Sequence, residues 1–268
     1  MGWAKYHEDI VSLWTNNNHK SYKIHTQQKK VAERKEVKAT LANHREREMS
    51  NLKEFTMSSA RPLPVIVLAD ISGSMSSDGK IDALNTSISE MISAFADEDD
   101  SKAEVFVSII AFGKGGAFVH ESLQPAKNIH WKPLEASGRT PMGEAFNLAK
   151  TMIEDRDLIP GRSYRPTIVL VSDGVPTDDW QSPLKALLDS ERASKAIRFA
   201  MGIGSDADQE TLRAFLADDN VPLFEAHEAR KIRNFFRWVT MSVTFRSRSA
   251  NPNTLIMPEP TDLDDFDF

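Results

Sequence analysis

The sequence predicts an α/β fold: a doubly wound, Rossmann-like sheet of six mostly parallel strands, with helices on both faces. Three observations support this. From Arg61 onward, short apolar segments of strand length alternate with segments of helical periodicity, the pattern of a parallel sheet. The strand segments are almost continuously apolar, which is typical of strands buried on both faces. One connection is too short for a crossover helix, so one edge strand is expected to be antiparallel.

The expected strands are apolar runs bounded by charged or turn-forming residues. The first, LPVIVLA, ends just before Asp70, and the fourth, TIVLVS, ends just before Asp173. Between these two, three glycines in the segment GKGG favour a hairpin, which makes the third strand the antiparallel one. The six expected strands cover residues 63–69, 104–112, 118–123, 167–172, 197–203 and 223–225.

Five amphipathic segments are expected to form the helices that cover the sheet. In the first, Ile81, Leu84 and Ile88 begin a stripe of apolar residues at spacings of three and four, which share one face of a helix. The last segment is rich in aromatic residues. The expected helices lie around residues 81–95, 145–153, 184–188, 212–216 and 232–243.

The charge distribution divides the chain into three parts. Residues 1–60 contain 11 Lys and Arg against 7 Asp and Glu, although the whole chain has a net charge of −6. Their sparse apolar positions predict a charged, mostly helical N-terminal extension, for which a solvated helix is the simplest interpretation. Residues 61–249 form the predicted α/β domain. Residues 250–268 form an acidic tail, interpreted either as a disordered solubilising segment or as a short recognition motif.

Composition and missing motifs exclude several classes of function. The chain has no cysteine, so disulfides, thiolate metal sites and cysteine nucleophiles are excluded. No apolar run approaches the ~20 residues needed to span a bilayer, and no signal-peptide core is present, so a cytoplasmic protein is expected. Gly-x-Ser-x-Gly and Walker A motifs are absent, and the seven His residues lack zinc-ligand spacing. The acidic balance of the domain disfavours nucleic acid as a partner.

Five oxygen-bearing residues are expected to meet at one rim of the sheet. Asp70 and Asp173 each follow an apolar strand, and open α/β sheets bind ligands at the carboxyl ends of their strands. Ser72 and Ser74 follow within the motif DISGS, and the loop SGRTP delivers Thr140 just before a helix. Carboxylate and hydroxyl oxygens without His or Cys favour Mg²⁺ or Mn²⁺. Two carboxylates only balance the charge of such an ion, which leaves it able to accept an anionic oxygen from a partner.

Each of these residues also has a local role that would explain it alone. Asp70 could form an Asx turn at the strand end, and Ser72 or Ser74 could cap the following helix. Thr140 before a proline is typical of a helix N-cap, and Asp173 before a glycine is a common turn. Only the five residues together favour a metal site.

Two further alternatives concern the same rim. Asp178 and Asp179 could extend it, but a solvated helix start is the simpler interpretation because acids favour helix N-termini. A dehalogenase-type phosphatase would need a second acid two positions after Asp70, where Ser72 stands.

These motifs carry a family resemblance. Asp-x-Ser-x-Ser at 70–74, the Thr of Gly-Arg-Thr-Pro and the Asp of Ser-Asp-Gly resemble the metal-ion-dependent adhesion site of von Willebrand factor A domains. The resemblance covers about residues 61–246 and includes the order of strands and helices. It implies that Ser72, Ser74 and Thr140 bind the ion directly, and that Asp70 and Asp173 bind it directly or through water. The segment IRNFFRWVTMSV resembles bacterial TerY-type tellurium-resistance members.

The residues and the resemblance together predict a non-enzymatic interaction module. Its expected partner is a protein that presents an Asp or Glu to the metal. Family analogy suggests a scaffold or adaptor in a bacterial stress-resistance or phage-defence system, with kinase and phosphatase partners. The alternative is a substrate-recognition or coupling subunit of an AAA+ ATPase machine. A hydrolase would need a water-activating group near the metal, which the sequence does not offer, and a homo-oligomer is compatible with the sequence.

The acidic tail carries candidate ligands of its own. Asp262, Asp264, Asp265, Asp267 and the terminal carboxylate of Phe268 are tethered to the domain, and tethering supplies millimolar effective concentrations. One hypothesis is that the tail occupies the open coordination position in the resting state, within a subunit or between subunits, and that partner binding displaces it. The simpler alternative is a tail that does not bind the rim.

Overall fold

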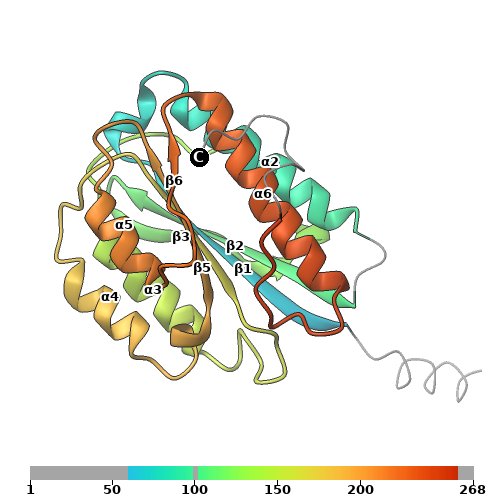
Figure 1. Cartoon of the computed structure of the whole chain (residues 1–268). Coiled ribbons are helices and arrows are strands. Elements are labelled where there is room, and N and C mark those ends of the chain that lie inside the picture. Colours follow the sequence, from blue (N-terminus) through green and yellow to red (C-terminus); the bar gives the residue numbers. More distant parts are fainter. Residues whose placement is uncertain (1–59, 99–101, 259–268) are drawn as a thin grey trace, which may run out of the picture. The chain divides into compact units, whose positions relative to one another are not determined.

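A computed structural model of the chain describes residues 60–98 and 102–258 (Figure 1). Within these residues, six strands form one sheet in the order β3-β2-β1-β4-β5-β6. Neighbouring strands are parallel except β2 and β3, which are antiparallel. The predicted mixed sheet is therefore confirmed. The strands are β1 (Arg61–Asp70), β2 (Ala103–Gly113), β3 (Gly116–Pro125), β4 (Thr167–Ser172), β5 (Ile197–Ile203) and β6 (Phe224–Ala226).

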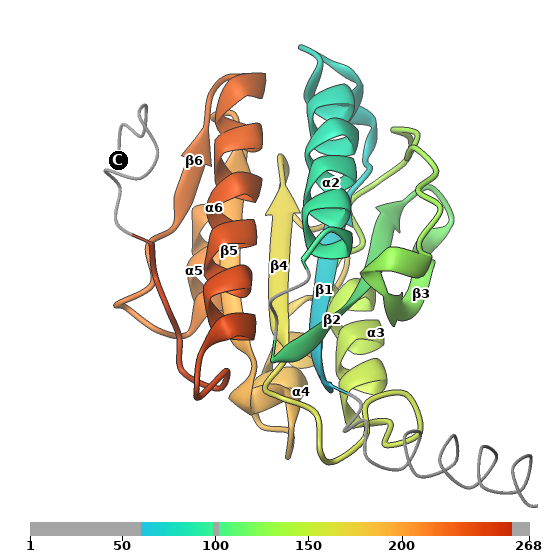
Figure 2. The same cartoon turned by 90° about the vertical axis from the view of Figure 1, so that its right-hand side faces the viewer.

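Helices cover both faces of this sheet, as predicted. In Figures 1 and 2, α2 and α6 lie side by side on one face, and α3, α4 and α5 lie on the other. Short 3₁₀ turns occur at Gly73–Ser76, Ala126–Asn128 and Ala193–Lys195. The helices are α2 (Lys80–Ala96), α3 (Met142–Glu154), α4 (Gln181–Leu188), α5 (Gln209–Leu216) and α6 (Ala229–Arg248).

The sequence predicts the ends of buried strands better than the ends of exposed ones. β4 and β5 have the expected bounds, because both are apolar runs in the middle of the sheet. β1 is buried at every position after Arg61 and forms the centre of the core together with β4. β3 lies at the edge and is half-buried or exposed throughout, so its apolar pattern is weak and it extends beyond the expected 118–123.

The aromatic residues of α6 pack this helix against β5 and the edge strand β6. The Trp238 ring lies 4.9 Å from that of Phe199 on β5 and 4.8 Å from that of Phe224 on β6, centroid to centroid. Phe235 also contacts Phe224, at 5.0 Å. These contacts fix the position of α6, whose N-terminus follows β6 at the rim formed by the carboxyl ends of the strands.

Arg246, near the end of α6, is a fully buried cation at the opposite end of the sheet. Its guanidinium donates hydrogen bonds to Thr167 Oγ1 at 2.5 Å, to the Arg165 carbonyl at 2.8 Å and to the Pro252 carbonyl at 2.9 Å. Burial and, to a smaller extent, the positive charge of the neighbouring Arg165 together lower its pKa to about 10. Arg246 thus joins α6, the start of β4 and the segment that follows α6.

That following segment returns along α6 toward the carboxyl rim. Ser242 Oγ donates to the Ile256 carbonyl at 2.5 Å, and Trp238 Nε1 donates to the Pro258 carbonyl at 3.2 Å. Pro252, Ile256 and Pro258 contact Arg246, Ser242 and Trp238 respectively. Later residues of the segment thus contact earlier residues of the helix, so the segment runs antiparallel to α6. Pro258 is the last described residue, and Trp238 lies nine residues after the start of α6, about 13 Å along a helix.

The predictions for residues 1–59 and for the acidic residues 259–268 lie outside the described residues. In the part of the chain that the structure does describe, no helix combines the length and the apolar character needed to cross a membrane.

Candidate metal centre

The register of the sheet brings the two predicted carboxylates together. β1 and β4 are parallel neighbours, and Ala69 pairs with Val171, so Asp70 and Ser172 occupy the next positions. Ser172 Oγ donates to Asp70 Oδ2 at 2.5 Å. Asp70 and Asp173 are both buried, at 0% and 1% exposure. Both carboxylates therefore lie below the rim surface.

Asp70 also forms the local turn that the sequence left as an alternative. The Ser72 backbone N–H donates to Asp70 Oδ1 at 2.7 Å, which is the hydrogen bond of an Asx turn. This bond and the Ser172 bond use one lone pair on each oxygen. Since each carboxylate oxygen has two lone pairs, the Asx turn and a role near a metal are compatible.

Ser72, Ser74 and Asp173 form a contiguous group of oxygen atoms. Ser74 Oγ donates to Asp173 Oδ1 at 2.7 Å, and Ser72 Oγ lies 3.4 Å from the same oxygen. The two serine hydroxyls are 3.0 Å apart. Neither serine side chain caps the 3₁₀ turn that follows Ser72. Ser74 is exposed and Ser72 is buried, so the group opens to solvent on the Ser74 side.

Thr140 approaches this group from the third loop. Its Oγ1 lies 3.5 Å from the position that a Cβ atom on Gly174 would take, which places the hydroxyl beside the residue that follows Asp173. Pro141, not Thr140, is the N-cap of α3, and no side chain at that position makes a capping hydrogen bond. Among the described residues the Thr140 hydroxyl has no hydrogen-bond partner. The alternative role of Thr140 as a helix cap is therefore not seen, and its hydroxyl is available.

Backbone hydrogen bonds join the three loops that carry these residues. The Gly73 N–H donates to the Gly138 carbonyl at 3.0 Å, and the Thr177 N–H donates to the Thr140 carbonyl at 2.9 Å. Gly138 has a φ of +92°, and a Cβ there would lie 2.3 Å from the Lys114 nitrogen, so only glycine fits. The three loops are thus held in register before any ligand binds.

Ser172 and Lys80 lie near the rim although the sequence does not predict them, and Asp178 is predicted only as an alternative extension of the rim. Ser172 supports Asp70, as described above. Lys80, the first residue of α2, donates from Nζ to Asp173 Oδ2 at 2.8 Å. Asp178 accepts from the Gly143 and Glu144 N–H groups at 3.0 and 2.9 Å, so it caps α3.

Asp179 lies at the start of the helix that follows it, as the sequence predicts, whereas Asp178 contacts a different helix. Asp179 Oδ1 accepts from the Ser182 N–H in the first turn of α4 at 3.3 Å, as expected for an acid at a helix start. Asp178 contacts the start of α3, which lies 35 residues earlier in the chain. Only tertiary structure reveals that contact, because the two segments are distant in sequence.

Burial favours the protonated form of the Asp70 carboxyl group in the metal-free protein. The pKa of Asp70 is raised from 3.8 to about 6, chiefly by burial and to a smaller extent by the negative charge of Asp173. The hydrogen bonds from Ser172 and Ser72 oppose this rise without cancelling it. A cation in the site would remove the penalty by balancing the buried charge.

This shift predicts how the stability of the metal-free protein depends on pH. Because the pKa of Asp70 is higher in the folded state, its stabilising contribution is full below pH 3.8 and is lost as pH rises through about 6. We expect the loss to be about 3 kcal/mol. Chemical denaturation in EDTA, compared with Asp70→Asn, measures it. The variant should gain stability over the native protein across this pH range, and a difference that does not change with pH would contradict the prediction.

The residues present fit a hard divalent cation. Two carboxylates and three hydroxyls converge at one rim, with no nitrogen or sulfur donor among the five, which is the donor set that Mg²⁺ and Mn²⁺ prefer. Within residues 60–98 and 102–258, no group of three or more His, Asp or Glu side chains forms a metal site. The candidate therefore depends on the hydroxyls as well as the carboxylates.

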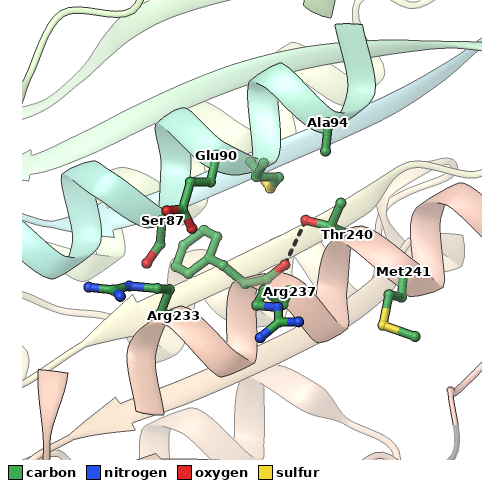
Figure 3. A pocket seen from close by; sticks show the side chains of 9 residues that line it. Ser87, Glu90, Ala94, Arg233, Arg237, Thr240 and Met241 are labelled. Atoms are coloured by element: carbon green, nitrogen blue, oxygen red, sulfur yellow. Dashed lines mark hydrogen bonds between the residues drawn. The ribbon is translucent and has the colours of Figure 1, made fainter. Parts of the chain in front are cut away.

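A separate pocket of about 310 Å³ lies between α2 and α6 (Figure 3). It includes none of the five rim residues. Glu90 on α2 faces Arg233 and Arg237 on α6 across it, and the Thr240 hydroxyl donates to the Phe236 carbonyl at 2.7 Å. The rim site is thus distinct from this pocket between helices.

The sequence matches a known family over the region that carries the candidate site. Residues 65–175 match the family model of the von Willebrand factor type A domain, and this range includes all five candidate ligands. Over this part of the chain, which is less than half of its length, the sequence is similar to a von Willebrand factor type A domain. A search of curated proteins finds no match.

Solved structures with the same fold come from distant proteins. Proximal thread matrix protein 1 from the mussel byssus has a TM-score of 0.55 and 15% identity over 67% of this chain and 47% of its own. The pilus adhesin SpaC from Lactobacillus rhamnosus GG has a TM-score of 0.56 and 14% identity, over 71% and 31%.

A third similar structure is the von Willebrand factor type A protein from Catenulispora acidiphila. It has a TM-score of 0.51 and 19% identity, over 68% of this chain and 42% of its own. The chain therefore spans less than half the length of each of these proteins. At such low identities the likenesses establish the fold of the von Willebrand factor type A domain and nothing finer.

Proposed function

We propose that this von Willebrand factor type A domain binds Mg²⁺ or Mn²⁺ at the rim and uses the ion to hold an acidic group of a protein partner. Ser72, Ser74 and Thr140 would bind the ion directly, and Asp70 and Asp173 directly or through water. The bound ion would supply an open coordination position for a carboxylate. The residues themselves provide the fixed oxygen atoms and the shape of the rim.

The convergence of the five oxygen donors carries this proposal. Their hydroxyl and carboxylate oxygens come from three loops that are distant in sequence, and backbone hydrogen bonds hold those loops together. The family supports the proposal, since such domains typically act as adhesion or protein-interaction modules. Among the similar structures, one form of the mussel protein has a zinc-occupied metal-ion-dependent adhesion site, and SpaC is a pilus adhesin.

Metal binding is the first test of this function. Calorimetric titration of the full chain with Mn²⁺ and with Mg²⁺ should show one site per chain. Affinity capture of partners with Mg²⁺, repeated in EDTA, then identifies proteins that are retained only with the metal. A chain that binds neither ion would overturn the proposal.

For the biological setting, we propose a scaffold or adaptor in a bacterial stress-resistance or phage-defence system. Neighbouring kinase and phosphatase genes would support this role. A neighbouring AAA+ ATPase gene would favour the alternative role as a coupling or substrate-recognition subunit.

The acidic tail remains our proposed internal ligand for the same site. The chain reaches Pro258 while running toward the rim, and the ten residues that follow can extend up to about 33 Å. We therefore expect the tail to compete with external acidic ligands for the metal. Residues 252–258 contact Arg246, Ser242 and Trp238, so a truncation that spares the domain must begin at Glu259.

A peptide experiment measures this competition. The peptide EPTDLDDFDF should bind the protein truncated after Pro258 in the presence of Mn²⁺ and not in EDTA. It should bind the full chain at least about tenfold more weakly, because the tethered tail is present at millimolar effective concentration. Equal affinities for the two proteins would show that the tail does not occupy the site.

A further inference from the structure

Lys80 places a positive charge inside the candidate metal centre. Its Nζ donates to Asp173 Oδ2 at 2.8 Å, where the Asp173 side chain has no exposed surface and the Lys80 side chain is 18% exposed. On its other side, the ammonium lies 3.7 Å from the position that a Cβ on Gly204 would take. Lys80 therefore extends from the start of α2 across the rim to the end of β5.

The hydrogen bonds of Asp173 are shared between this cation and a candidate ligand. Oδ1 accepts from Ser74 Oγ, and Oδ2 accepts from Lys80. One oxygen of this carboxylate thus faces the predicted metal ligands, and the other carries an ion pair. Any metal that Asp173 helps to hold must share the carboxylate with the ammonium.

The charge of the Lys80 ammonium affects the binding of a cation and of an anion in opposite directions. With Asp70 and Asp173 ionised, these two side chains and Lys80 together carry a charge of −1, and the two carboxylates alone carry −2. Adding a divalent cation changes these values to +1 and zero. The lysine therefore opposes the arrival of the cation, and it favours the arrival of an anion once the cation is bound.

We propose that Lys80 sets the balance of this site, weakening its hold on the divalent cation while strengthening the hold of the cation-loaded site on an acidic ligand. This inference rests on the proposed metal-dependent function. Lys80 acts through Asp173 and through its own charge, so it is a specificity-determining residue that need not touch the metal. A salt bridge that only fastens α2 to the rim would not produce two effects of opposite sign.

The test measures both affinities in the full chain. Lys80→Met should bind Mn²⁺ more tightly than the native protein, on the order of tenfold, as measured by calorimetry. With Mn²⁺ saturating, sodium acetate is then added at constant ionic strength, and its binding is followed by the loss of Mn²⁺-bound water in proton relaxation. Acetate should bind Lys80→Met about threefold or more weakly than the native protein.

Two variants complete the design. Lys80→Arg keeps the charge and should resemble the native protein in both measurements. Lys185→Met removes a lysine from an exposed ion pair with Asp189 and should change neither affinity. Circular dichroism establishes folding, and Lys80→Gln replaces Lys80→Met if the latter does not fold.

The outcomes separate this inference from the proposed function. If the native chain binds no Mn²⁺, the metal-dependent function itself fails. If the native chain binds Mn²⁺ but Lys80→Met binds it equally or more weakly, the inference about Lys80 is wrong. Acetate binding that is unchanged in Lys80→Met also contradicts the inference.

Discussion

Asp70→Asn is expected to weaken Mg²⁺ or Mn²⁺ binding at least about 100-fold while leaving the metal-free fold intact. Removing a buried negative charge beside a divalent cation costs several kcal/mol even at an effective dielectric constant near 20. The asparagine oxygen can still accept the Ser72 N–H, so the turn that follows β1 is retained. Because the charged Asp70 is unfavourable in its buried site, the metal-free variant should unfold less readily at pH 7 than the native protein.

The pair Asp70→Asn and Asp70→Ala distinguishes charge from structure. Alanine removes the acceptor of both the Ser72 N–H and the Ser172 hydroxyl, so this variant should lose both metal binding and the stability gain of the asparagine variant. Asp189→Asn, in an exposed ion pair, serves as the control and should bind the metal normally. Calorimetry showing native Mn²⁺ affinity in Asp70→Asn would remove Asp70 from the ligand set.

Arg246→Ala is expected to lower the free energy of unfolding by about 3 to 5 kcal/mol, the range seen when large buried side chains are truncated. The substitution leaves a cavity, and it leaves Thr167 Oγ1 and two carbonyl oxygens without their donor. Arg246→Met fills most of the volume and removes the cost of burying a charge, so its loss should be smaller. Urea denaturation at pH 7 measures all three proteins.

A second arginine provides the comparison. Arg156 forms an ion pair with Glu191 in which both side chains are 69% exposed, so Arg156→Ala should change stability by less than about 1 kcal/mol. If Arg246→Ala were as mild as Arg156→Ala, the contacts between α6, β4 and the returning segment would contribute little to the stability of the domain.

The sequence predicts the fold well where a strand is continuously apolar or where apolar residues repeat at helical spacing. The buried apolar runs of β4 and β5 have clear ends, and the buried apolar positions of α6 repeat at spacings of three and four. β3 is harder to delimit because an edge strand with exposed positions mixes polar and apolar residues. The returning segment after Ser249 has no periodicity, so only the structure shows that Trp238 and Arg246 hold it.

Some residues of the candidate site can likewise be predicted from the sequence, and others cannot. Asp70, Asp173 and Thr140 are predictable because strand ends and a loop before a helix must meet at the rim of a parallel sheet. Lys80 has no such signal, since a lysine in the first turn of a helix usually faces solvent. Ser172 is the last residue of a strand, and its bond to Asp70 depends on the register between two strands. These supporting contacts are tertiary and need coordinates.

The hydrogen bonds among the three rim loops have a thermodynamic consequence. Gly73 is fixed to Gly138, and Thr140 to Thr177, so the entropy of arranging the ligands is lost when the chain folds and not when the ion arrives. Binding should therefore order little backbone and bury little apolar surface. Calorimetry at several temperatures should give a heat-capacity change near zero for Mn²⁺, with an unchanged far-ultraviolet circular dichroism spectrum. In that respect the rim would behave as a prebuilt receptor, unlike small zinc domains in which metal binding and folding are one event.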